Sequence, residues 1–142
     1  MSRVVPALAA ALALAAAAFA APQAGPAMTV TINPEGRVGV VLGTDVPTGG
    51  ARGVPIEFRV LVINQGFSTG RLEARLVGKP APAARLEFQP QPLRGIPRES
   101  RTLWITLGGA EPVDVTIAFQ LQDGDADLGG RDRVHLLLRP RA

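Results

Sequence analysis

The most regular feature of this chain is an alternation of apolar and polar residues with a period of two, which starts at Met28 and recurs to the end. A period of two places successive side chains on opposite faces of a β-strand, whereas a helix that faces a core needs a period near 3.6. After residue 28 no stretch keeps the helical period. The pattern therefore predicts an all-β protein.

The alternation divides into strand candidates separated by turn signals about every 8–12 residues, which is typical of an antiparallel β-sandwich. The longest candidate, Val54 to Asn64, becomes apolar on both faces near its end, so we expect it to be central. We predict an immunoglobulin-like sandwich of about seven or eight strands. The other candidates are 28–32, 38–42, 71–76, 86–88, 103–107, 113–122 and 134–138.

One phase of this alternation supplies the predicted core. Its members are apolar, and they are separated by polar or charged residues that would face solvent. In 38–42, for example, Val38, Val40 and Leu42 share a phase. The predicted core consists of Ile56, Phe58, Val60, Val62, Leu72, Leu76, Phe88, Leu103, Ile105, Val115, Ile117, Phe119, Leu136 and Leu138.

Three segments interrupt the pattern. Residues 43–53 are rich in glycine and are interpreted as a loop. Residues 78–84 contain two prolines, which lack amide donors, so this segment is not expected to form a central strand. Residues 89–92 (QPQP) are expected to be extended and polyproline-like.

The N-terminus has the features of a secretory signal peptide. Arg3 gives a short positive region, Val4 to Ala17 are apolar, and Ala18-Phe19-Ala20 places small residues where a signal peptidase cleaves. No cysteine follows, which argues against a lipoprotein anchor. We expect a signal peptide at 1–20, a flexible lead at 21–27 and one β-sandwich domain at 28–142. The mature chain would work in the periplasm or outside the cell, without stable membrane insertion.

Composition narrows the possible functions further. The chain has 15 basic and 12 acidic residues, and loss of Arg3 with the signal peptide would lower its net charge from +3 to about +2. Arginines alternate with acidic residues along the sequence, so no nucleic-acid partner is predicted. There is no cysteine, so the core alone must hold the fold.

Part of the sequence resembles a family of domains. Val60-Leu61-Val62-Ile63-Asn64-Gln65-Gly66 has the form V-x-V-x-N-x-G, and Leu93 to Leu107 loosely fits a later strand segment. Over roughly residues 54–122 the chain is similar to bacterial exported immunoglobulin-like accessory domains of the fibronectin type III and CARDB group. The resemblance implies an architecture and brings no site residues.

Catalysis by a serine–histidine device is not predicted. His135 is the only histidine, and it occupies the polar phase of its strand between Arg133 and Arg139. The mature serines, Ser68 and Ser100, lack the Gly-x-Ser-x-Gly turn that exposes a nucleophile. We interpret His135 as a surface residue and the protein as a non-enzyme.

Calcium is the one metal ion for which the sequence offers a candidate site. Zinc and copper sites need several histidine or cysteine ligands, which this chain lacks. Calcium prefers carboxylates, and Asp123, Asp125 and Asp127 have the D-x-D-x-D spacing, with Asp132 as a further ligand. The run has no glycine at the sixth position and no glutamate at the twelfth, so a solvated hairpin loop is the alternative interpretation. Calcium is the one cofactor considered.

Two aromatic residues are candidates for partner binding. Trp104 has the polar phase of its strand, so it is either an exposed anchor or a residue covered by the 89–98 segment. Phe67 lies in the loop 64–70, which with the loop 43–53 could form a recognition surface. We expect a non-enzymatic exported accessory module that contacts a protein partner in the cell envelope, for example during assembly of a surface or envelope structure. The alternatives are a small periplasmic chaperone of curli-like subunits that pairs at a strand edge, and a calcium-dependent binding module that uses 123–132.

Overall fold

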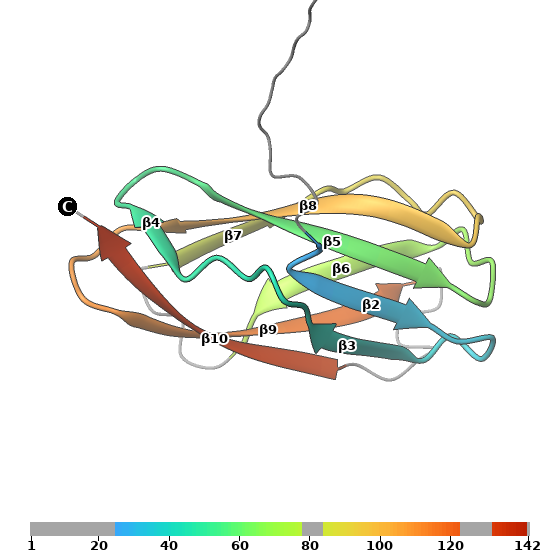
Figure 1. The fold of residues 1–142 in the computed structure, drawn as a ribbon. Coiled ribbons are helices and arrows are strands. Elements are labelled where there is room, and N and C mark those ends of the chain that lie inside the picture. The colour runs from blue at the N-terminus through green and yellow to red at the C-terminus, as the bar shows by residue number, and fades with distance from the viewer. Residues whose placement is uncertain (1–24, 78–83, 123–131, 142) are drawn as a thin grey trace, which may run out of the picture.

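The computed structural model describes residues 25–77, 84–122 and 132–141. Within these residues the chain is all-β, and nine strands form two curled sheets that enclose a shared core (Figure 1). The prediction of an all-β protein is confirmed. The described part of the chain contains no helix that could cross a membrane.

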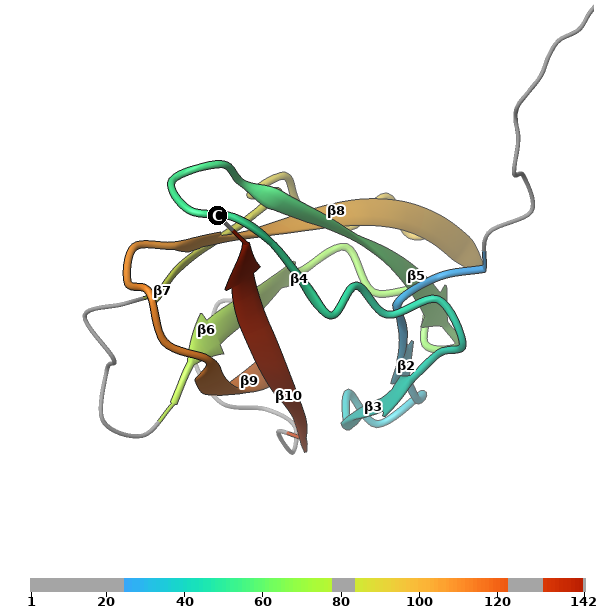
Figure 2. The same ribbon diagram turned by 60° about the vertical axis from the view of Figure 1, so that its left-hand side comes forward.

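The larger sheet has five strands in the order β3-β2-β5-β8-β7. β2 and β5 run parallel, and the other pairs are antiparallel. β2 lies beside β5 and β3 lies outside β2, so the β2–β3 hairpin forms this edge of the sheet (Figure 2). The strands are β2 (Met28–Ile32), β3 (Val38–Leu42), β5 (Ile56–Asn64), β7 (Ala84–Phe88) and β8 (Arg98–Leu107).

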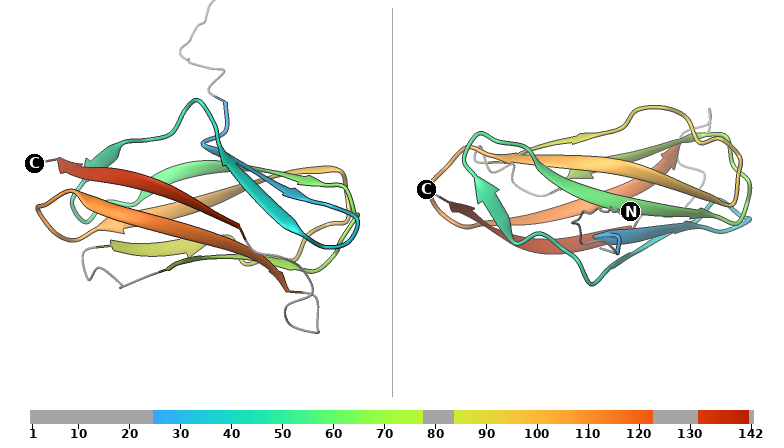
Figure 3. Two further views of the ribbon diagram at one scale, coloured as in Figure 1. Left: turned by 90° about the horizontal axis from the view of Figure 1, so that it is seen from below. Right: turned by 45° about the horizontal axis from the view of Figure 1, so that its top comes forward.

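The smaller sheet has four strands in the order β4-β10-β9-β6. β4 pairs in parallel with the end of β10, and the other pairs are antiparallel. Seen from below, this sheet turns its outer face to the viewer (Figure 3, left). Its strands are β4 (Gly49–Ala51), β6 (Arg71–Leu76), β9 (Val113–Gln122) and β10 (Asp132–Arg141).

The core lies between the two sheets and is built from alternate side chains of each strand. Every predicted core residue belongs to it or packs against it, and all are buried except Leu76 and Phe88, which are half-buried. Phe88 meets Phe119 edge to face, with ring centroids 5.9 Å apart. The core also includes residues of the β2–β3 hairpin that were absent from the predicted set, namely Met28, Val30, Ile32, Val38 and Val40.

One local expectation was wrong in part. The loop interpretation of 43–53 fails at β4, where Gly49 lies so close to the chain that an added Cβ would collide with the carbonyl oxygen of Arg139. The glycine therefore permits a strand to approach closely rather than marking a loop. Leu42 has the phase of Val40 but is 43% exposed, because β3 is an edge strand that ends at this residue.

Candidate interaction site at the loop end

Three connections meet at one end of the two sheets, the right-hand end of Figure 1. They are residues 33–37 between β2 and β3, 64–70 between β5 and β6, and 89–97 between β7 and β8; together we call them the loop-end surface. Backbone hydrogen bonds link them: Gln65 donates at 2.8 Å to Ile32, the last residue of β2 before 33–37, and Leu93 donates to Gly70 at 2.8 Å. This surface is therefore one connected unit.

Asn64 organises the middle connection from within. It is fully buried, and its side-chain amide bonds both backbone groups of Ser68: Nδ2 donates to the carbonyl oxygen at 2.8 Å, and Oδ1 accepts from the amide at 2.9 Å. The hydroxyl of Ser68 then accepts from the amide of Gly70 at 3.0 Å. A buried amide that is satisfied in this way fixes the loop in one conformation.

Phe67 lies at the tip of this fixed loop. Its φ is +52°, a left-handed conformation that costs a non-glycine residue about 1–3 kcal/mol. Its side chain is 61% exposed. The rest of the loop thus holds a large apolar side chain toward solvent in a strained backbone, and such strain is concentrated at functional sites.

The neighbouring connection is pinned by an ion pair inside the domain. Glu99 and Arg101 face inward from the start of β8, and their side chains are 4% and 6% exposed and 2.8 Å apart. Arg101 also donates to the carbonyl oxygens of Gln91 at 2.6 Å and Pro92 at 2.9 Å, and Glu99 accepts from the amide of Arg94 at 2.6 Å. The pair therefore holds residues 91–94 against the sheet.

Sequence reasoning gave no role to Asn64, Glu99 or Arg101. The strand phase could have found the last two, because Leu103, Arg101 and Glu99 alternate on one face of β8. Charged residues at inward positions beside a proline-rich connection indicate side chains that bind the backbone of that connection rather than apolar packing; we call this arrangement the clasp. Asn64 gives a similar signal, because it continues the inward phase of Val60 and Val62 in β5, but its partner Ser68 becomes apparent only from the loop conformation.

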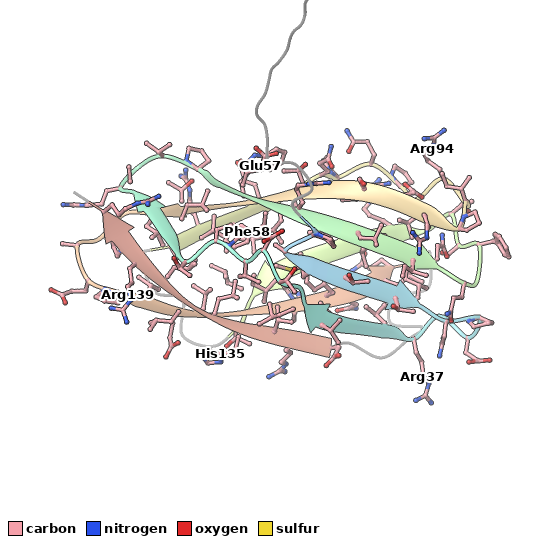
Figure 4. The ribbon with its side chains drawn as sticks, in the orientation of Figure 1. Arg37, Glu57, Phe58, Arg94, His135 and Arg139 are labelled. Atoms are coloured by element: carbon pink, nitrogen blue, oxygen red, sulfur yellow. The ribbon has the colours of Figure 1, made fainter. Side chains whose placement is uncertain are left out.

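Trp104 and Phe67 are not brought together. Trp104 is half-buried on the outer face of β8, between Glu57 of β5 and Glu87 of β7 in the sheet register. Figure 4 shows Glu57 pointing outward on that face. Phe67 follows the far end of β5, so the two aromatic candidates belong to different parts of the molecule.

His135 lies on the outer face of the four-stranded sheet, where it points away from the core (Figure 4). Its Nε2 is 2.9 Å from Asp114, and both side chains are about two-thirds exposed. Ser100 faces outward on the opposite sheet, and Ser68 lies in the loop-end surface. These three residues therefore cannot act together as a nucleophilic device.

The calcium candidates are divided between described and undescribed residues. Asp123, Asp125 and Asp127 lie outside the described residues. Asp132 is described, and its two carboxylate oxygens accept from the amides of Val40 at 3.0 Å and Arg133 at 2.9 Å. Among the described residues, no three acidic, histidine or cysteine side chains are grouped to hold a metal.

A second surface feature lies where the edge strands β6 and β7 face each other. A hollow of about 230 Å³ between them is lined by Leu72, Ala74, Leu86 and Phe88, with Arg71 and Arg75 at its rim. Val77 donates to Thr116, so by alternation the amides of Leu72 and Ala74 point away from β9. This side of the core is thus bordered by two edge strands.

Comparison with known proteins adds no relative. No protein-family model matches the chain, and no curated protein shows significant similarity to it.

Proposed function

We propose that this protein is a non-enzymatic exported accessory domain that binds a protein partner through its loop-end surface. The observation that supports this most strongly is Phe67, an exposed aromatic residue in a left-handed conformation that Asn64 holds in place. Aromatic side chains that are presented rigidly lose little entropy on binding and often dominate interface energies.

The strand order is consistent with an immunoglobulin-like domain. β5, β8 and β7 correspond to strands B, E and D of that fold, and β6, β9 and β10 correspond to C, F and G. The β2–β3 hairpin is then an addition beside strand B. In this assignment Phe67 lies on the B–C connection, at an end of the sandwich that variable immunoglobulin domains use for binding.

Export is supported by the sequence of residues 1–20, with its positive start, apolar stretch and small residues before Ala21. The partner is then expected in the cell envelope, in the periplasm or at the surface.

Site-specific crosslinking tests this proposal. A photo-crosslinking residue at Gln65, which is exposed beside Phe67, should trap one dominant protein from the envelope of the native bacterium. The same probe in a Phe67→Ala background should trap much less, and a probe at Trp104 should trap none of it. Equal capture from both positions, or capture that survives Phe67→Ala, would exclude the loop-end surface.

The hollow between β6 and β7 favours a second candidate, a chaperone that pairs with an extended strand of an aggregation-prone subunit. Half-buried Ala74, Leu86 and Phe88, which line the hollow, would receive alternate apolar side chains while the outward backbone groups of the edge strands bond the added strand. The substitution Ala74→Pro removes an outward amide without breaking the β6–β9 ladder. It should abolish any delay of fibril formation by such a subunit, whereas Ala74→Val should preserve the delay.

A further inference from the structure

Among the described residues, five exposed arginines share the outer face of the four-stranded sheet. They occupy the outward-facing phase of β6 and β10, two strands that are far apart in the sequence, so the fold gathers their side chains on one side. Figure 4 shows Arg139 and His135 directed to this side, opposite to Glu57. We call this set the arginine face: Arg71, Arg75, Arg133, Arg139 and Arg141.

Few acidic groups oppose these charges on the same face. Among the described residues that face outward there, the acidic ones are Glu73, which is half-buried, and Asp114, which is 2.9 Å from His135. The outer face of the other sheet is more balanced, with Arg59, Arg85 and Arg98 against Glu57 and Glu87. The described part of the domain is therefore polarised, with its surplus positive charge on one side.

Apolar surface accompanies the arginines. Leu137 lies on the same face between His135 and Arg139 and is 47% exposed. Ala118 faces outward between Arg75 and Arg133 in the register but is only 2% exposed, so the long flanking side chains must cover it. The face combines cationic heads, aliphatic stems and one exposed leucine.

We propose that the arginine face docks this domain peripherally on a bilayer that contains anionic phospholipids. Guanidinium groups bind phosphate through paired hydrogen bonds and keep their charge at any physiological pH. The charges are spread across two strands that lie on either side of β9, which suits an extended anionic surface better than a single small ligand. Leu137 would enter the headgroup region, as apolar residues do when a protein lies on a membrane.

Vesicle sedimentation tests this inference. The domain should bind vesicles of equal parts phosphatidylglycerol and phosphatidylcholine, and should not bind vesicles of phosphatidylcholine alone. Each arginine at the surface contributes about fivefold in affinity, so the double substitution Arg133→Gln/Arg139→Gln should weaken binding about 25-fold. The matched control is Arg85→Gln/Arg98→Gln, which removes the same charge from the opposite outer face and should change binding less than twofold.

Three outcomes would overturn the inference: no binding to the anionic vesicles, equal losses in both double variants, or equally tight binding to heparin, a soluble polyanion. The last would assign the face to polyanionic chains instead of a bilayer. Circular dichroism of each double variant confirms that the fold is retained. Phe67→Ala should bind vesicles normally, so a failure here and a failure of the loop-end surface are distinguishable.

Discussion

Asn64 and Ser68 are joined by two hydrogen bonds: the Asn64 side-chain amide donates to the Ser68 carbonyl oxygen at 2.8 Å and accepts from the Ser68 backbone amide at 2.9 Å. This pair closes the loop behind Phe67 and leaves the phenyl ring outside it. The loop conformation is therefore set from the interior of the domain and does not depend on a partner. A partner would meet Phe67 already in place, which lowers the entropy cost of binding.

Loss of the Asn64 amide should weaken the whole domain. Asn64→Ala leaves the Ser68 amide and carbonyl without their partners in a partly buried site, so we expect the free energy of unfolding to fall by about 2–3 kcal/mol. Urea denaturation followed by tryptophan fluorescence measures this. Gln65→Ala, at the exposed next position, should change stability by less than about 0.5 kcal/mol. Equal stability of the two variants would show that the clamp is unimportant.

The strained backbone at Phe67 should lower the stability of the domain, although the side chain serves binding. Glycine adopts a φ of +52° without strain, but it also has a higher conformational entropy in the unfolded chain, which favours unfolding. The relief of strain is the larger effect, so Phe67→Gly should stabilise the domain by about 1 kcal/mol. Phe67→Ala keeps the strain and should be nearly neutral. Thermal melts of the two variants make the comparison. If Phe67→Gly is the less stable of the two, the strain argument is wrong.

The buried pair of Glu99 and Arg101 should behave as a unit. Arg101→Met leaves the Glu99 carboxylate buried without its cation, which costs about 3–5 kcal/mol. Adding Glu99→Leu removes that carboxylate, so the double variant should recover part of the loss. A double-mutant cycle from chemical denaturation gives the coupling. Additive losses would mean that the two residues contribute independently.

The glycines of the edge strands differ in what they permit. Gly49→Ala would place a methyl group against the carbonyl of Arg139, so β4 should detach from β10 and stability should fall by at least about 2 kcal/mol. Gly39 has no atom within 4 Å of an added Cβ, so Gly39→Ala should be neutral or stabilise by about 0.5 kcal/mol. Hydrogen exchange of the Arg141 amide reports whether β4 has detached. Similar melting temperatures for both variants would contradict the proposed close approach.

Much of the fold could be predicted from the sequence, because strand periodicity is a local property that burial reinforces. Phe58, Val60 and Val62 alternate with exposed or half-buried neighbours as expected. The β2–β3 hairpin has the same alternation, but its place beside β5 in a parallel pair depends on contacts distant in sequence. β4 was missed because its glycines look like a loop until Arg139 lies beside them.

The candidate site was less predictable, because its features depend on the folded backbone and not on local periodicity. Phe67 was identified as an apolar residue in a loop that could contact a partner, but its strain is a property of the folded backbone. The Asn64 clamp depends on the conformation of the loop 64–70, and the clasp of Arg101 on Gln91 and Pro92 depends on how the 89–97 connection folds back on β8. The arginine face also required the structure, since β6 and β10 are far apart in the sequence and only the sheet order places them on either side of β9.

The most direct test of the central claim is a chemical-shift map. The partner captured by crosslinking would be titrated into the isotope-labelled domain, residues 21–142, and the amide shifts followed. Binding through the loop-end surface predicts the largest changes at 64–70, with smaller ones at 33–37 and 93–96. Changes centred on Trp104 or on the β6–β7 edges, with residues 64–70 unaffected, would contradict it.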